Sequence, residues 1–264
     1  MNTSIIARKS IENRSRKAMS NSQVGTYKFE AFPFHLDVRG KLSMGVLGKH
    51  LLNCADAYAA ERGFDVVEQG GEHYTWVLSR LAIELEDLPS CHESFSIQTW
   101  VENVYRLFAD RNFVICNKDE KPIGYVRSVW AMISMETRNP ANLLDLHGDR
   151  ITNSICEKEC PIAKPGRIKV SQQEAVSEYV AKYSDLDING HVNSIKYIEH
   201  ILDIFPLDIY KKKALKRFEI AYVAESYYGD TLSFYLEEKN ENEYDIEVRK
   251  SSTEVVVRSK VIFK

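Results

Sequence analysis

Three polar side chains in the second half of the chain could together cleave an ester or a thioester. Asp187, Asn189 and His191 alternate with other residues just before an amphipathic stretch. His191 can move protons near neutral pH, Asn189 can donate an amide hydrogen bond, and Asp187 can orient either of them. Gly190 would let a substrate approach the backbone closely. A base, an oxyanion donor and an orienting group are the parts that such a hydrolysis requires.

This segment precedes a helical pattern, so we expect its backbone N–H groups at a helix N-terminus. Unpaired amides and the helix dipole favour negative charge there, and a carbonyl held against them would be polarised. The alternative is structural. Asp and Asn before a helix are ordinary caps worth about 1 kcal/mol, and Gly190 can simply turn the chain.

A repeat within the chain favours the chemical interpretation. Residues 37–43 read Asp-Val-Arg-Gly-Lys-Leu-Ser, and residues 187–193 read Asp-Ile-Asn-Gly-His-Val-Asn. The first copy has Arg39 and Lys41 where the second copy has the amide and the imidazole. Folding of the first copy needs neither group, so we predict a single active site, in the second copy.

A second match in the same order supports a duplication. Arg80-Leu-Ala-Ile recurs as Arg217-Phe-Glu-Ile, and each arginine is followed sixteen residues later by a serine, Ser96 or Ser233. Each half also starts with a helical pattern and continues with strands, as a repeated supersecondary unit would.

Hydrophobic periodicity predicts one main helix and four strands in each half. Helical spacing covers residues 42–58, which Gly63 terminates, and residues 192–205, which Pro206 stops. Runs rich in β-branched and aromatic residues, separated by turns, cover residues 74–86, 93–102, 111–117, 124–135, 214–223, 231–239, 243–249 and 254–263. A helix set against an antiparallel sheet in each half is an α+β fold.

The length of 264 residues predicts two domains of ordinary size, each long enough to bury a real core. The expected organisation is a mobile tail over residues 1–23, a first domain over 24–145, a linker over 146–172 and a second domain over 173–264. The linker assignment follows from its proline and glycine content and its few periodic apolar residues.

Composition excludes several classes of protein. Hydrophobic residues make up 44% and charged residues 28%, and no apolar run approaches the ~20 residues of a membrane helix. A formal net charge of −3 argues against a general nucleic-acid binder. Five scattered cysteines argue against a disulfide framework and for a reducing cytoplasm. Cys156 and Cys160 lack a second ligand pair at matching spacing, so no metal site is expected.

Residues 184–198 resemble the catalytic segment of the acyl-acyl-carrier-protein (acyl-ACP) thioesterases, which are plant plastid enzymes and their bacterial relatives. Their sequence is Ser-Asp-Leu-Asp-Ile-Asn-Gly-His-Val-Asn-Ser-Ile-Lys-Tyr-Ile. Three further segments resemble the N-terminal half of that family: Thr75-Trp-Val-Leu-Ser-Arg, Gln98-Thr-Trp-Val and Ser128-Val-Trp-Ala-Met. The resemblance implies two hot-dog folds in tandem, each a helix wrapped by an antiparallel sheet. It also implies cofactor-free hydrolysis of the thioester between a fatty acyl chain and the phosphopantetheine of acyl carrier protein, which ends chain elongation in fatty acid biosynthesis.

The resemblance also implies which residues act. It gives catalytic positions to Asp187, Asn189, His191 and Glu225, with the N-terminal half shaping the acyl pocket. Either Glu225 or His191 would activate water, and the sequence does not choose between them. A single Glu before a turn is otherwise most often a solvated acid.

Two positions depart from the family pattern. Ser226 stands where the family typically has a cysteine after the glutamate, so attack by water is favoured over a cysteine nucleophile. A serine nucleophile would lack the usual elbow motif. Gly190 replaces the usual glutamine of the catalytic motif, which we expect to change a local contact rather than the reaction.

The acyl pocket and the partner surface are assigned less directly. Trp76, Trp130 and Met132 are candidates to line the pocket, although such residues at strand positions are more often core. Acyl carrier protein is acidic, so a docking patch should be basic. The candidate cations are Lys211, Lys212, Lys213, Lys216 and Arg217. The alternative is a solvated charge run.

Other functions on the same scaffold were weighed. An acyl-CoA thioesterase would use the same site, and a non-catalytic acyl-thioester-binding protein would lack the polar set or carry a DNA-binding segment. A hydratase or dehydratase motif would have a proline and one more residue before the histidine. A tandem pair can mimic a hot-dog dimer within one chain, so both a monomer and a homodimer are compatible with the sequence.

Overall fold

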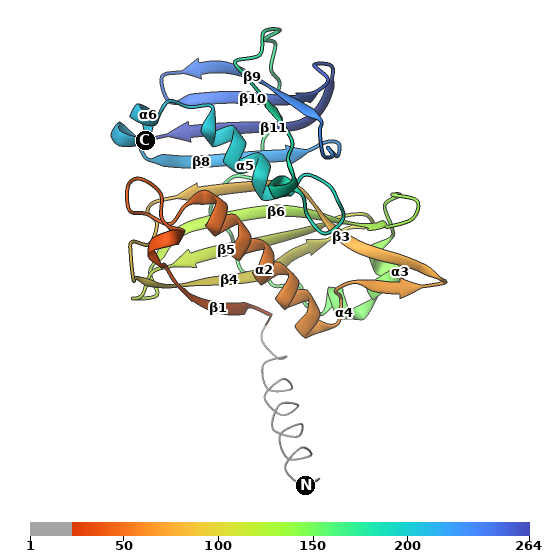
Figure 1. Cartoon of the computed structure of the whole chain (residues 1–264). Helices are drawn as coiled ribbons and strands as arrows, with labels where there is room; N and C mark the ends of the chain where they lie inside the picture. The colour runs from red at the N-terminus through yellow and green to blue at the C-terminus, as the bar shows by residue number, and fades with distance from the viewer. Residues whose placement is uncertain (1–22) are drawn as a thin grey trace, which may run out of the picture.

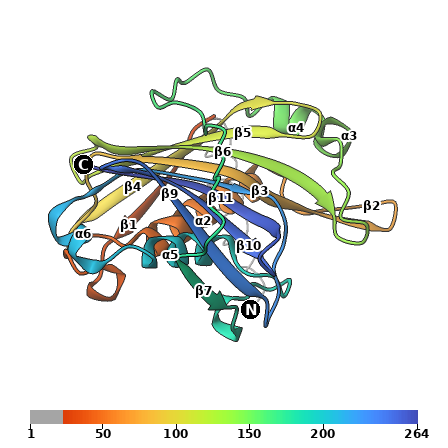
Figure 2. The same ribbon diagram turned by 90° about the horizontal axis from the view of Figure 1, so that it is seen from above.

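The computed structural model describes residues 23–264, and most of the expected tail, residues 1–22, lies outside the described residues. One continuous antiparallel sheet carries two helices, α2 and α5, on the same face (Figure 1). Viewed from above, β5, β6 and β3 lie on one side of both helices and β7 lies on the other, so the sheet curves around the helices (Figure 2). No helix of residues 23–264 is long and apolar enough to span a membrane.

The first half contains one long helix and most of the strand length. Its elements are β1 (Gly25–Glu30), α2 (Met44–Arg62), β2 (Val67–Gln69), β3 (Glu72–Leu85), β4 (Ser94–Val104), β5 (Ala109–Cys116) and β6 (Pro122–Ser134). Ser43 caps α2 through its side chain, and Gly63 ends it in the left-handed conformation at φ 70°. Two short helices follow, α3 (Leu143–His147) and α4 (Asp149–Thr152).

The second half repeats the pattern with a shorter helix. Its elements are β7 (Ser177–Val180), α5 (Ser194–Asp203), α6 (Leu207–Lys212), β8 (Leu215–Tyr222), β9 (Thr231–Asn240), β10 (Glu243–Lys250) and β11 (Glu254–Phe263). The helix pattern predicted to stop at Pro206 does so, because proline follows α5 and opens α6 as its cap.

The strand order confirms the duplication. The sheet runs β1-β4-β5-β6-β3-β8-β11-β10-β9-β7, so the second half repeats the first in reverse order about the β3–β8 junction. At that junction Arg80 pairs with Ala221 and Glu84 pairs with Arg217. Arg80 and Arg217 are the arginines matched in the sequence, and each lies two residues before its strand's member of the Ala82–Glu219 pair. The register between the two strands is therefore symmetric about that pair.

The two helices pack closely because α2 presents glycines to α5. A Cβ atom on Gly48 would lie 2.6 Å from Cδ1 of Ile195, and one on Gly45 would overlap the carboxylate of Glu199. A side chain at either position would therefore have to displace a side chain of α5. This contact holds α5, and the loop that precedes it, against the first half.

A single core crosses both halves. The largest buried cluster joins Leu47 and Leu51 of α2 to Ile198 of α5 and Phe218 of β8. The two hot-dog units share one sheet, and their helices are in contact. Their buried side chains therefore join into one core. The α+β tandem hot-dog prediction itself is confirmed.

The segment after α4, residues 153–176, packs on the face of the sheet opposite the helices. Cys160 and Ile162 are buried there, and Arg127 donates to both of their carbonyl oxygens at 2.7 Å. The expected linker thus covers the sheet rather than only connecting the halves. It also contains α4 and the end of α3.

All eight strands predicted from periodicity are present, with ends displaced by only a few residues. The strands β1, β2 and β7 and the short helices α3, α4 and α6 were not predicted. Each of these is short, so its sequence carries too few periods of apolar spacing to be recognised.

Candidate active site

The catalytic loop, defined as residues 187–191, is a tight turn held together by the carboxylate that opens it. Oδ1 of Asp187 accepts the backbone N–H of Asn189 at 2.8 Å and that of His191 at 3.2 Å. The N–H of Asp187 donates to the carbonyl of His191 at 2.8 Å, and Gly190 adopts φ +79°. Glycine is suited to that left-handed position.

The corresponding loop of the first half has the same backbone hydrogen bonds but lacks the asparagine and the histidine. Oδ1 of Asp37 accepts the N–H of Arg39 at 2.8 Å and that of Lys41 at 3.2 Å. The Arg39 side chain also donates to Oδ2 of Asp37. Since both copies use the aspartate in this way, Asp187 holds the backbone of the loop, and the hypothesis that it directly orients the Asn189 or His191 side chain is not supported by any bond of the structure.

The expectation that the amides of this loop belong to a helix N-terminus is wrong. The helix α5 begins at Ser194 and is capped by Asn193, whose Oδ1 accepts the N–H of Ile195 at 2.9 Å. The N–H groups of Asn189 and His191 are already bonded to Asp187, so they are not free to bind an oxyanion. The side-chain amide of Asn189 is exposed and lines the catalytic cavity described below.

His191 and Glu225 meet across two loops that the backbone aligns. Nε2 of His191 lies 3.5 Å from Oε2 of Glu225, which sits in the turn between β8 and β9. A backbone bridge pairs His191 with Tyr227, and the N–H of Val192 donates to the carbonyl of Ser226 at 2.8 Å. These contacts fix the histidine loop beside the glutamate turn.

Arg138 and Tyr227 complete the cluster, and sequence reasoning missed both. Arg138 follows β6 in the first half, with φ +60°, and its guanidinium donates to Oε1 of Glu225. The Tyr227 hydroxyl donates to Oε2 of Glu225 at 3.3 Å, and its ring meets the His191 ring edge-on at 5.1 Å. Arg138 is 87 residues from Glu225 in the chain, so no local pattern signals their contact.

The surroundings keep the imidazole neutral. Burial lowers the pKa of His191, the Arg138 cation lowers it further, and the Asp187 carboxylate partly opposes both. A histidine that is neutral at pH 7 can accept a proton. The electrostatics of the cluster therefore suit proton abstraction from a bound water.

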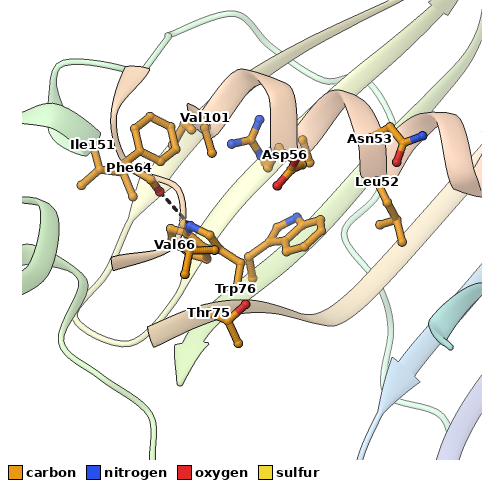
Figure 3. Close-up of a pocket in the computed structure, with 14 residues that line it drawn as sticks. Leu52, Asn53, Asp56, Phe64, Val66, Thr75, Trp76, Val101 and Ile151 are labelled. Carbon is orange, nitrogen blue, oxygen red and sulfur yellow. Dashed lines mark hydrogen bonds between the residues drawn. The ribbon is translucent and has the colours of Figure 1, made fainter. Parts of the chain in front are cut away.

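A cavity of about 540 Å³ runs over this cluster and is called the catalytic cavity here. Its walls include Asp187, Asn189, His191, Glu225 and Arg138. A second cavity of about 270 Å³ lies between α2 and the sheet of the first half (Figure 3) and is called the distal pocket. The two share the lining residues Leu52, Thr75, Trp76 and Trp130, so they are adjacent.

Two of the three candidate pocket residues line these cavities. Trp76 and Trp130 line both of them, and Nε1 of Trp76 donates to the carbonyl of Phe64 at 2.8 Å (Figure 3). Met132 lines neither, because it is fully buried with its sulfur 3.1 Å from Nε2 of His147. Neither of the two cavities therefore supports the assignment of Met132 to the acyl pocket.

The five candidate cations do not form one exposed patch. Arg217 is buried, with ion pairs to Glu84 and Glu219 at 2.7 Å, so its assignment to a docking surface is wrong. Lys211, Lys212 and Lys216 are exposed and Lys213 is half-buried. The lysines of α6 follow the C-terminal end of α5, whereas the catalytic loop precedes its N-terminal end (Figure 1). Ten helical residues span ~15 Å, which separates that group from the active site.

Ser226 does not offer a nucleophile to the cavity. Its side chain is fully buried, and it does not line the catalytic cavity although the neighbouring Glu225 does. Attack by water, favoured from the sequence, remains the mechanism that the geometry suits.

Comparisons with known proteins identify the family. The model of the acyl-ACP thioesterase N-terminal domain matches residues 23–148, and that of the C-terminal domain matches residues 168–264. A chloroplastic palmitoyl-acyl carrier protein thioesterase of Gossypium hirsutum is 24% identical over 218 residues, covering 78% of this chain and 53% of that protein. The chloroplastic oleoyl-acyl carrier protein thioesterase 2 of Arabidopsis thaliana is 28% identical, covering 65% of this chain and 49% of that protein. The chain thus spans about half the length of these curated relatives.

Solved structures agree with this result. The crystal structure of an acyl-ACP thioesterase from Bacteroides thetaiotaomicron has 60% sequence identity and a TM-score of 0.87, covering 92% of this chain and 98% of that one. The 12:0-ACP thioesterase from Umbellularia californica shares the fold, with a TM-score of 0.77 at 16% identity and coverage of 92% and 94%. The chain belongs to the acyl-ACP thioesterase family.

Proposed function

We propose that this protein hydrolyses the thioester of fatty acyl-ACP, releasing a free fatty acid and the carrier protein, and so ends chain elongation in fatty acid biosynthesis. The observation that carries the proposal is the contact between His191 and Glu225 at the wall of a cavity that adjoins the distal pocket. A polar cluster with adjacent space for an acyl chain is the arrangement that thioester hydrolysis requires.

In the proposed reaction, the thioester carbonyl lies in the catalytic cavity with its acyl chain directed past Trp76 and Trp130. Water attacks the carbonyl carbon while the His191–Glu225 pair takes its proton. The side-chain amide of Asn189 donates to the developing oxyanion. The tetrahedral intermediate then collapses, the carbon–sulfur bond breaks, and the pair returns the proton to the departing thiolate.

The pair is proposed to work as one unit. Glu225 accepts hydrogen bonds from Arg138 and Tyr227, which fix its position, and it lies close enough to hold the imidazole in place. His191, kept neutral, is then the proton acceptor, and Glu225 stabilises the imidazolium that forms. The separation of 3.5 Å is long for a hydrogen bond and is expected to shorten when substrate binds.

The two halves are proposed to have different but overlapping roles. The first half supplies most of the distal pocket and the second half supplies the proton-transfer groups, but Arg138 brings the first half into the site as well. Acyl-CoA hydrolysis at the same site is the alternative activity, because the cavity contacts would treat the acyl part of both substrates alike.

The test is free-thiol release from acyl-ACP and acyl-CoA that carry the same acyl chain. We expect cleavage of acyl-ACP with a higher kcat/KM, and a loss of about 10²–10³-fold in kcat for Asn189→Ala. Arg39→Ala, the matched change in the first-half loop, is the control and should retain activity. Binding of both substrates without thiol release would show a non-catalytic acyl-binding protein, and equal kcat/KM values would favour a general acyl thioesterase.

A further inference from the structure

Arg111 brings a positive charge to the wall of the distal pocket. It lies on β5 in the middle of the first-half strands, between Val101 of β4 and Ser128 of β6. It is 6% exposed and lines the distal pocket. The other polar residues of this wall are Asn53, Asp56 and Thr75, and the rest are apolar or aromatic (Figure 3). A buried cation calls for a partner, and Asp56 is not within ion-pairing distance of Arg111.

Within residues 23–264 no carboxylate lies within ion-pairing distance of Arg111. Its Nη1 donates to Oγ1 of Thr99 at 3.4 Å, and its guanidinium carbon lies 4.5 Å from the centre of the Tyr58 ring. The guanidinium of Arg62 contacts the same ring, at 3.6 Å. One long hydrogen bond and a shared aromatic face leave most of the five N–H donors of the guanidinium without a strong acceptor.

Two other arginines of the sheet, the half-buried Arg127 and the buried Arg217, have carboxylate partners. Arg127 pairs with Glu102, and Arg217 pairs with Glu84 and Glu219. Both lie under the segment that covers the opposite face of the sheet, and both also donate to its carbonyl oxygens. Arg127 and Arg217 thus have carboxylate and carbonyl acceptors within the protein. Arg111 has no carboxylate acceptor among the described residues.

The charge of Arg111 persists at neutral pH. Burial lowers its pKa to about 10, which still leaves the guanidinium protonated. The distal pocket consequently presents charged donors to whatever occupies it. Donors placed in an apolar pocket set the orientation and the specificity of a ligand.

We propose that the distal pocket selects acyl chains that carry an oxygen acceptor, a hydroxyl or a carboxylate, on the part of the chain remote from the thioester, and that Arg111 binds this oxygen. The inference rests on the proposed thioesterase function and specifies its substrate class. A chain with its thioester at His191 would pass Trp76 and Trp130, which line both cavities, before it reaches Arg111. An unsubstituted chain would fill the same space but leave the guanidinium without an acceptor.

The experiment compares acyl-ACP substrates of equal chain length that end in a methyl, a hydroxyl or a carboxyl group, over a series of lengths. At the preferred length we expect kcat/KM at least ~10-fold higher for an oxygenated chain than for the plain one. A higher value for the hydroxyl or for the carboxyl chain identifies which acceptor is used. Arg111→Met should remove the preference or reverse it, because a pocket without donors favours the apolar chain.

Controls separate this inference from general damage and from the proposed function. Arg62→Met removes the other cation on the Tyr58 ring without changing the lining of the distal pocket, and should keep the preference. Cleavage of plain chains at least as fast as oxygenated ones by the wild type overturns the inference and leaves the thioesterase proposal standing. If Arg111→Met does not fold, the wild-type ratio alone decides. If no substrate is cleaved, the proposed function fails. Binding of free fatty acids then tests the pocket inference by itself, and equal affinity for plain and oxygenated fatty acids would overturn it.

Discussion

At the scale of single residues, Arg138 of the first half contacts Glu225 of the second half, beside the proposed catalytic pair. Its guanidinium holds Glu225, and its charge helps to lower the pKa of His191. One side chain thus binds Glu225 and, after burial, is the second cause of the lowered pKa of His191. Its contribution can be separated from a packing role, because only an electrostatic role alters the pH dependence of the reaction.

Arg138→Met should move the acidic limb of the kcat/KM profile to higher pH. The cation disfavours the imidazolium, so its removal raises the pKa of His191 and extends the pH range in which the base is protonated and inactive. Arg138→Lys, which keeps the charge, should shift the limb less. A profile of unchanged shape with only a lower plateau would mean that Arg138 acts through packing alone.

Substitution of the two loop aspartates should have similar effects on stability but different effects on activity. Asp187→Ala and Asp37→Ala each remove an acceptor of two backbone N–H groups, so each should lower the free energy of unfolding by about 1–3 kcal/mol. Only Asp187→Ala should also lower kcat, since only its loop carries His191. Denaturant unfolding and thiol release measure the two effects. Equal loss of activity in both variants would contradict the assignment of the site to the second copy.

At the scale of elements, the contact between α2 and α5 depends on the absence of side chains. Gly48→Leu should destabilise the protein by about 1–3 kcal/mol, because even its Cβ would meet Cδ1 of Ile195 at 2.6 Å. Lys49→Leu, on the exposed side of the same helix, is the matched control and should change stability little. The denaturant midpoints of the two variants and the wild type measure these effects. A Gly48→Leu protein as stable as the wild type would show that the helices can move apart.

On β8, substitution of two adjacent cations should change stability by very different amounts. Arg217→Met leaves Glu84 and Glu219 without their partner, and breaking such a buried pair costs about 3–5 kcal/mol. Lys216→Met, at an exposed position, should leave the free energy of unfolding nearly unchanged. If Arg217→Met kept full stability and lost only affinity for acyl carrier protein, the docking assignment made from the sequence would be restored.

The sequence predicted the long elements well because each repeats its apolar spacing several times. The helix before Gly63 and the eight longest strands are of this kind. It placed Asn189, His191 and Glu225 through the internal repeat and the family resemblance, and all three line one cavity. It could not find Arg138, because that contact depends on how the halves pack, nor recognise Arg217 as buried, because a charged residue under a covering segment looks like a surface residue in sequence.

At the scale of the whole molecule, the continuous sheet and the shared core make the two halves one folding unit. Thermal or denaturant unfolding should therefore follow a single cooperative transition, with the same midpoint for far-UV circular dichroism and tryptophan fluorescence. All three tryptophans lie in the first half, whereas circular dichroism reports on both. Two separated transitions would show that the halves unfold independently despite their common sheet.

The central claim is that one copy of a duplicated loop carries the chemistry. Its most direct test is the rate of free-thiol release from acyl-ACP by the wild type, His191→Ala and Lys41→Ala, which alter the same position in the two copies. Loss of a general base should reduce kcat by about 10²–10⁴-fold in His191→Ala, while Lys41→Ala should stay close to the wild type. A His191→Ala protein that turns over at the wild-type rate would contradict the account.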